Sequence, residues 1–292
     1  MSTFMHAVGF GLVTSAVIAL SAVALSLQFS VSNIPNFAHG EFLTLGMYGA
    51  LVAQYLTNNV FVDVLVGAIV VGAAAWLINR TIIEPFNRRG AKVTVLFVVT
   101  IALSLMIQNA IIVFFGGTTH SLVVPSETVS QVGPFLFTAA DMIVMAVAVA
   151  VMLAVHVILR YTTFGKSQRA VADSRELASV TGINMPRVVA LTWLMAGAIA
   201  GIAGAVIAFQ GGTFSPLTGY TFLLVTFAAA VAGGLGRPYG AMIGALILGL
   251  VTEVGGSYLA SSYKQVIAVG ILVVVLLIRP SGLFDARGRT TI

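Results

Sequence analysis

The sequence contains little charge and no cysteine. Only 8% of its 292 residues are charged, against about 25% in an average soluble domain, and 59% are hydrophobic. A soluble fold of this size could not bury so much apolar side chain. The absence of cysteine excludes disulfides, thiolate metal sites and cysteine nucleophiles. The composition therefore predicts an integral membrane protein.

Sequence motifs for common enzymatic chemistry are also missing. Lys166 and Ser167 follow Gly165, but position 160, where a phosphate-binding P-loop needs its first glycine, is Arg. Neither His-Glu-x-x-His nor Gly-x-Ser-x-Gly occurs. The net charge of +5 comes from short basic clusters, as in the loops of membrane proteins. We therefore expect no enzymatic activity, no metal site, no cofactor bound by this chain and no nucleic-acid partner.

Long hydrophobic runs predict one transmembrane domain over residues 1–292. It is an all-α polytopic bundle of about 8–9 transmembrane helices, because about 20 apolar residues span a bilayer as a helix. The predicted spans are 7–29, 34–56, 61–79, 93–115, 139–159, 188–210, 220–234, 239–255 and 265–278. The last three are short and interrupted by glycine, which leaves the number of spans open.

The basic residues predict the direction of the chain in the membrane. If nine spans alternate, thirteen of the fourteen Lys and Arg residues fall on one face, and only Lys264 falls on the other. The loop 116–138 contains neither Lys nor Arg and lies on the opposite face. Since basic loops stay in the cytoplasm, we expect the N-terminus outside and the C-terminus inside.

The second predicted span begins with polar residues, which make it a candidate translocation pathway or gate. These residues are Asn36, His39, Gly40 and Glu41. An ionisable group within a span costs about 2.5–3.5 kcal/mol on insertion scales, so it usually faces protein or water. Pro35 favours an unwound stretch that lines a cavity; a helical stretch would instead place Ser32, Asn36 and His39 on one stripe. A purely structural role, joining two helices, stays open as the alternative.

The loop 160–187 predicts one amphipathic helix over residues 166–181. Arg169 and Asp173 form an i,i+4 pair, and Gly182 suits the end of the helix. One face carries a stripe of small residues, namely Val171, Ser174, Ala178 and Thr181. This helix is either a docking surface for a partner or a solvated connector.

Two groups of glycines predict close contacts between helices. These are Gly197, Gly201 and Gly204, and Gly236, Gly240 and Gly244. Their spacing is typical of helices whose backbones approach each other. We expect internal packing, with a seam that moves during transport as the alternative.

Four ordered segments resemble one family of transporters. Residues 36–42, Asn-Phe-Ala-His-Gly-Glu-Phe, followed by Leu-Gly-Met-Tyr at 45–48, resemble the signature of bacterial branched-chain amino acid ABC importer permeases of the LivH type. Residues 164–184 are similar to the cytoplasmic coupling loop of that family. Residues 232–244 and 279–284 are similar to its glycine-rich segment and its closing motif. The match covers nearly the whole chain, although Ile34-Pro35 and Arg237-Pro238 depart from the pattern.

This resemblance implies a multi-pass subunit of the bacterial inner (plasma) membrane. It implies a second, LivM-like permease, two LivG/LivF-like ATPase subunits that bind ATP and Mg, a periplasmic substrate-binding protein and surrounding lipid. Residues 168–182 would be the coupling helix, with Gly165, Arg169, Asp173, Arg175, Glu176, Ala178 and Gly182 in the ATPase-coupling loop. The substrate would be Leu, Ile, Val or another neutral amino acid. Urea or a short amide is the alternative, and a transporter or channel that acts alone is an alternative of another class.

Overall fold

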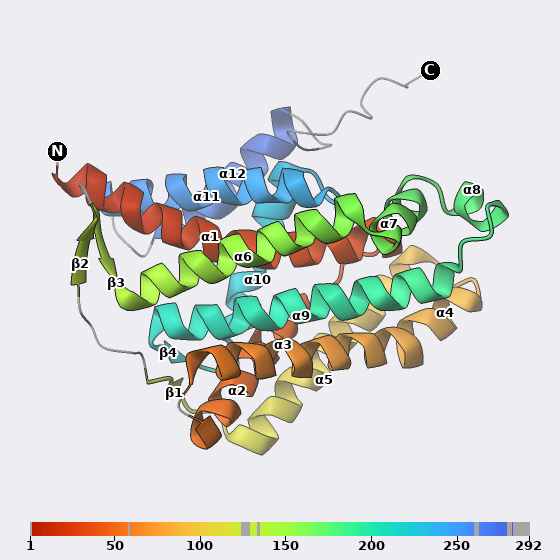
Figure 1. The fold of residues 1–292 in the computed structure, drawn as a ribbon, viewed down its shortest axis with the longest axis horizontal. Helices are drawn as coiled ribbons and strands as arrows, with labels where there is room; N and C mark the ends of the chain where they lie inside the picture. Colours follow the sequence, from red (N-terminus) through yellow and green to blue (C-terminus); the bar gives the residue numbers. More distant parts are fainter. Residues whose placement is uncertain are drawn as a thin grey trace.

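The chain folds into a bundle of long helices (Figure 1). The computed structural model describes residues 2–57, 59–123, 129–132, 135–259, 263–278 and 282. The first half contains α1 (Ser2–Ser32), α2 (His39–Thr57), α3 (Val60–Ile78), a π-helical turn η1 (Asn79–Ile83), α4 (Glu84–Arg88) and α5 (Val93–Phe115). The second half contains α6 (Ala139–Tyr161), α7 (Thr163–Asp173), α8 (Arg175–Val180), α9 (Met185–Gly211), α10 (Thr218–Gly233), α11 (Pro238–Tyr258) and α12 (Lys264–Ile278).

The helices confirm an all-α membrane protein. Six of those in the described part of the chain are long and apolar enough to cross a bilayer: α1, the continuous helix from α3 through η1 to α4, α5, α6, α9 and α11. Helices α10 and α12 are apolar but shorter. The predicted span 93–115 coincides with α5. The third predicted span was too short, since its helix continues through η1 and α4 as far as Arg88.

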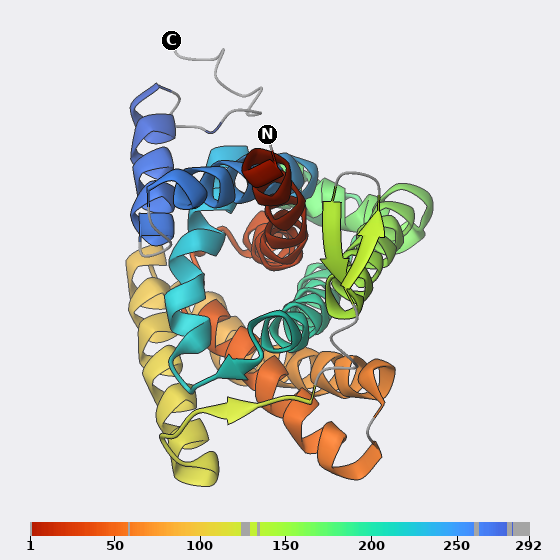
Figure 2. The same cartoon turned by 90° about the vertical axis from the view of Figure 1, so that its left-hand side faces the viewer.

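The most buried helices lie at the centre of the bundle. Helices α1 and α9 are largely buried, and α2 is buried along most of its length, whereas α5 and α6 expose most of their surface. Figure 2 looks along the bundle and shows α5 and α12 at one edge, with α9 inside. The buried side chains of these central helices are therefore shielded from the surrounding lipid.

Short strands join the loops at the end of the bundle opposite α7 and α8. Strand β1 (His120–Ser121) pairs antiparallel with β4 (Thr213–Phe214), and β2 (Val129–Val132) pairs antiparallel with β3 (Phe135–Thr138). Figure 1 shows both pairs at the end where the N-terminus lies. They close the loops without changing the helical fold class.

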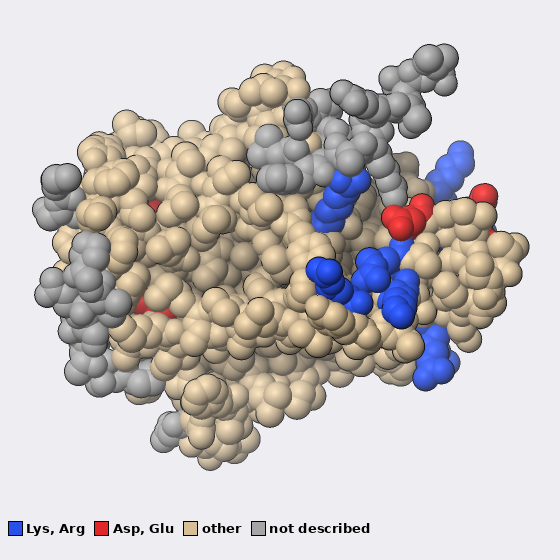
Figure 3. Space-filling view, turned by 45° about the horizontal axis from the view of Figure 1, so that its top comes forward, with Lys and Arg blue, Asp and Glu red and all other residues tan. Residues whose placement is uncertain are grey.

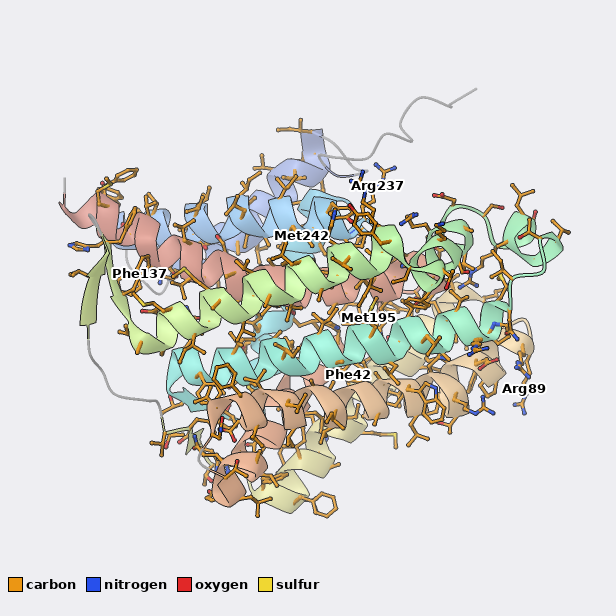
Figure 4. All side chains as sticks on the ribbon, viewed as in Figure 1. Phe42, Arg89, Phe137, Met195, Arg237 and Met242 are labelled. Carbon is orange, nitrogen blue, oxygen red and sulfur yellow. The ribbon has the colours of Figure 1, made fainter. Side chains whose placement is uncertain are left out.

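The charges are divided between the two ends of the bundle. Lys and Arg gather toward the end that carries α7 and α8 (Figure 3). Arg89 and Arg237 lie at that end, while Phe137 lies near the other (Figure 4). Lys264 lies at the end away from α7 and α8, where its Nζ is 2.6 Å from the Glu253 carboxylate. The bundle therefore has one strongly basic end.

Candidate functional site

The connection between α1 and α2 is not helical. The predicted span 34–56 becomes helical only at His39, where α2 begins. Pro35 has no backbone N–H to donate, and Asn33 adopts the left-handed conformation, with φ of 53°. Asn36 then starts the helix, since its side-chain oxygen accepts the N–H of Ala38 at 3.0 Å. The unwound alternative is the one that forms.

The unwound segment brings the start of α2 into the interior of the bundle. His39 Nε2 lies 3.2 Å from the carbonyl oxygen of Ser21. Ser21 precedes the last residue of α1, Ser32, by eleven positions, or about 16 Å at 1.5 Å per residue. Residues 33–38 therefore run back along α1, and α2 starts well inside the bundle.

Buried polar side chains from four helices lie around the start of α2. We define them as the buried polar junction: Ser21 of α1, Asn36 and His39 at the start of α2, Glu41 of α2, Ser104 of α5 and Thr226 of α10. Each is less than 9% exposed. Ser21 Oγ lies 3.3 Å from His39 Nε2 and 2.8 Å from Thr226 Oγ1. A neutral His39 that carries its proton on Nε2 can donate to the Ser21 carbonyl, so the network joins α1, α2 and α10.

Two further contacts tie the junction to its surroundings. Asn36 Nδ2 donates to the side-chain oxygen of Gln28 at 2.8 Å. Ser104 Oγ donates to Glu41 Oε1 at 3.2 Å. The second carboxylate oxygen, Oε2, is buried and has no hydrogen-bond partner among the described residues. A buried polar atom without a partner is costly, so this oxygen is a position where another polar group would be stabilised.

Gly40 lets α2 and α10 approach each other closely. A Cβ at Gly40 would lie 2.9 Å from the carbonyl oxygen of Gly219 and 3.2 Å from Cα of Tyr220. A Cβ at Gly219 would in turn overlap the carbonyl oxygen of Gly40. Neither position can hold a larger residue unless a helix moves.

The loop between α6 and α9 contains two helices where one was expected. Ser174 is extended, with φ of −155°, and its side chain accepts the N–H of Leu177 at 3.3 Å. The Ser174 hydroxyl therefore caps the first turn of a new helix, α8. The expected stripe of small residues is thus divided between α7, which holds Val171, and α8, which holds Ala178. Val171 and Ala178 of that stripe are buried within this chain, at 2% and 3% exposed. The residues that α8 exposes are Glu176, Leu177, Ser179 and Val180.

Two side chains of this α7–α8 loop hold the end of α1. Gln168 Nε2 donates to Ser30 Oγ at 3.0 Å, and the Arg175 guanidinium donates to the carbonyl of Val31. Burial lowers the pKa of Arg175. Its Nε is also buried and has no partner among the described residues. The loop therefore contacts α1 within a few residues of the unwound segment that leads to His39.

Other predicted residues of this loop fix its shape. Gly165 lies against the last turn of α6, where a Cβ would overlap the carbonyl of Ile158. The Arg169 guanidinium donates to the carbonyl of Leu159, also in α6. Asp173 is the last residue of α7, and Gly182 follows α8 with φ of 80°. Gly165 and Arg169 therefore hold the corner between α6 and the loop.

Most of the predicted glycines face a neighbouring helix. On α9, an added Cβ at Gly197 or Gly201 would crowd α3, and one at Gly204 would crowd α2. On α11, Gly240 and Gly244 lie against α10 in the same way. Gly236 does not share their helix, because α11 begins at Pro238 and Gly236 forms the preceding turn with φ of 81°.

Comparison with known proteins places the chain in a family. A family profile described as "Branched-chain amino acid transport system / permease component" matches residues 7–276. The chain belongs to this permease family. It is 31% identical to the "High-affinity branched-chain amino acid transport system permease protein LivH" of Escherichia coli (strain K12), over 94% of this chain and 92% of that protein.

Two other relatives in this permease family come from distant organisms. One is the "High-affinity branched-chain amino acid transport system permease protein BraD" of Pseudomonas aeruginosa, 28% identical over 94% of this chain and 93% of that protein. The other is the "Probable branched-chain amino acid transport permease protein LivH" of Methanocaldococcus jannaschii, 30% identical over 93% and 90%. No solved structure matches the chain at a comparable level. The closing motif that resembled this family, residues 279–284, lies outside the described residues except for position 282.

Several partners of the site are not visible in the sequence of this permease. Ser21, Ser104 and Thr226 are single hydroxyl residues within apolar runs, and Gln168 is one polar residue in a polar loop. Nothing in their spacing indicates which helices pack together. Only the fold brings Ser21 to His39 and Ser104 to Glu41.

Proposed function

We propose that the chain is the membrane-spanning permease subunit of an ATP-driven importer of branched-chain or other neutral amino acids. The observation that carries this proposal is the family match across residues 7–276, together with relatives named as branched-chain amino acid permeases. The importer would include a second permease, two ATPase subunits that bind ATP and Mg, and a periplasmic binding protein. This chain would supply the pathway and no nucleotide site.

The basic end of the bundle favours an orientation with the N-terminus outside. Helices α7 and α8 lie at that end, and α1 begins at the opposite one (Figures 1 and 3). Because basic loops stay inside, the α7–α8 loop would face the cytoplasm of a bacterial inner membrane. The ATPase subunits would then dock on this loop.

The exposed part of α8 is the best candidate for the docking surface. Leu177 is 67% exposed and Val180 is 81% exposed, although both are large apolar residues. Exposed apolar groups on a polar loop indicate a partner that covers them. Ala178 is buried in this chain, so it would support α8 from behind rather than contact the ATPase.

The buried polar junction is our candidate gate. In the closed arrangement, hydrogen bonds from Ser21, His39 and Thr226 hold α1, α2 and α10 together. A movement of α1 would break these bonds, and Glu41, two residues after His39, carries an Oε2 without a partner among the described residues that a polar group in the opened pathway could bind. ATP binding would bias this two-state element through the hydrogen bonds from Gln168 and Arg175 to α1.

The test is ATP-driven uptake by the co-purified complex in liposomes, with labelled leucine as substrate and valine, urea and acetamide as competitors. We expect leucine uptake that needs ATP, and a fall of about tenfold or more in the Leu177→Ser, Val180→Ser double variant, because α8 loses its apolar contact. Ser179→Ala on the same helix is the control. Uptake by the chain alone without ATP would contradict the importer. Competition by urea but not by valine would contradict the amino-acid substrate.

A further inference from the structure

The helix formed by α3, η1 and α4 is longer than the hydrocarbon core of a bilayer is thick. It runs without a break from Val60 to Arg88, over 29 residues. At 1.5 Å per residue it measures about 43 Å, against about 30 Å for the hydrocarbon core. Its last turns therefore lie in the layer of lipid headgroups, at the basic end of the bundle.

The exposed side of this helix is apolar along α3 and becomes basic at Arg80. Leu65, Ile69, Trp76 and Leu77 are all exposed on the α3 part of the helix. The next exposed charged residue is Arg80, and its guanidinium lies 5.9 Å from the centre of the Trp76 ring. Trp is enriched where a span leaves the hydrocarbon, so Trp76 marks the boundary and Arg80 lies at the height of lipid phosphates.

A pocket lies beside this boundary. It has a volume of about 370 Å³ and is lined by Arg80, Glu84, Pro85, Arg88 and Arg89. The Glu84 carboxylate lies 2.5 Å from Arg88 Nη2 and neutralises one of the three guanidinium groups. Glu84 is largely buried, with a side chain 14% exposed, whereas the Arg88 side chain is 69% exposed. The pocket therefore keeps a net positive charge and presents its donors outward.

We propose that this pocket binds the phosphate group of an anionic phospholipid. A guanidinium group can donate two parallel hydrogen bonds to phosphate oxygens, and basic pockets on the cytoplasmic side of transmembrane helices suit anionic headgroups. The acyl chains would then lie along the exposed apolar side of α3, on the hydrocarbon side of Trp76. This site belongs to the membrane-facing side of α3, so it does not depend on the docking surface of α8 or on the transported substrate.

The experiment compares the lipids that the full chain retains after purification from mixed micelles of phosphatidylglycerol and phosphatidylcholine, counted by native mass spectrometry. The wild-type chain should retain phosphatidylglycerol preferentially. Arg80→Gln combined with Arg89→Gln should reduce that retention by about tenfold or more, since each basic residue near the headgroups contributes to binding. This pair leaves the Arg88–Glu84 ion pair intact.

The matched control is Arg160→Gln. The Arg160 guanidinium also lies 5.9 Å from an aromatic ring, that of Tyr161, but it does not line this pocket. Thermal unfolding of each variant shows that the fold is kept. The proposal is overturned if both lipids are retained equally, or if Arg160→Gln lowers retention as much as the double variant. It is also overturned if millimolar inorganic phosphate displaces the lipid, since the pocket would then be a site for free anions.

Discussion

Two connections interrupt the bundle, and they are built differently. Residues 33–38 join the long α1 to α2, and residues 212–217 join the long α9 to α10. The first connection leads into hydrogen bonds with α1 and α5, made by Asn36, Phe37 and His39. The second bonds mainly to itself, for example from the N–H of Ser215 to Thr218 Oγ1 at 2.8 Å, and it adds the β1–β4 pairing.

The difference indicates two kinds of joint between helices. The first connection is held by polar groups that can exchange partners, and it lies next to the contacts that the α7–α8 loop makes with α1. The second ends at a backbone-to-backbone contact with α2, because Gly219 at the start of α10 faces Gly40 and Thr44. Packed backbones do not deform gradually, whereas hydrogen bonds can open one at a time. We infer that the first connection moves and the second serves as its fixed support.

Gly219→Val should disrupt the close packing of α10 against α2, which supports the second connection. The new side chain would overlap the Gly40 carbonyl and lie near the backbone nitrogen of Thr44, which is 2.9 Å from the position of an added Cβ. We expect destabilisation of about 3 kcal/mol or more, seen as a loss of monodisperse protein in detergent. The control is Gly211→Ala at the end of α9, next to the same connection, where an added Cβ meets nothing within 4 Å. Equal yields for both variants would refute the packing argument.

Arg175→Ala should separate ATP hydrolysis from transport. The variant loses the hydrogen bond to the Val31 carbonyl but leaves the exposed side of α8 unchanged. We expect uptake to fall about tenfold at an unchanged content of ATPase subunits, because interactions along such a link modulate coupling by about 0.5–2 kcal/mol.

The measurement for Arg175→Ala is the number of ATP molecules hydrolysed per leucine transported, a ratio that a simple loss of folded protein does not change. Arg175→Lys should restore part of the coupling, since an ammonium group can still donate to a carbonyl. The control is Arg187→Ala, a basic residue in the first turn of α9. An unchanged ratio in Arg175→Ala would show that the loop acts on the bundle by another route.

Much of this fold can be predicted from the sequence, because bilayer spans are long apolar runs. The boundaries of α5 follow from its apolar run. The basic end of the bundle follows from the positions of Lys and Arg along the chain. The start of α2 was predicted only in part, since the apolar run suggested a span from residue 34, whereas Pro35 favoured the unwound stretch that precedes His39. The division of the α7–α8 loop depends on one hydroxyl, that of Ser174, in a segment that is otherwise suitable for a helix. Contacts across the bundle, such as Ser104 with Glu41, depend on packing that spacing does not encode.

Thr226→Val tests the hydrogen bond between α1 and α10, and its expected effect is smaller than those of Gly219→Val and Arg175→Ala. It replaces the hydroxyl that lies 2.8 Å from Ser21 Oγ by a methyl group of similar size, so packing is kept and one hydrogen bond between α1 and α10 is lost. Such bonds contribute on average about 0.6 kcal/mol in membrane proteins, and we expect that loss in denaturant titrations. Thr192→Val is the control, because the Thr192 hydroxyl is equally buried but bonds to Val188 in its own helix, at 2.9 Å. If the junction is a gate, Thr226→Val should also raise ATP hydrolysis in the absence of substrate, since the closed state is weakened, whereas Thr192→Val should not. Equal stability and equal hydrolysis in the two variants would mean that the junction only packs the helices together.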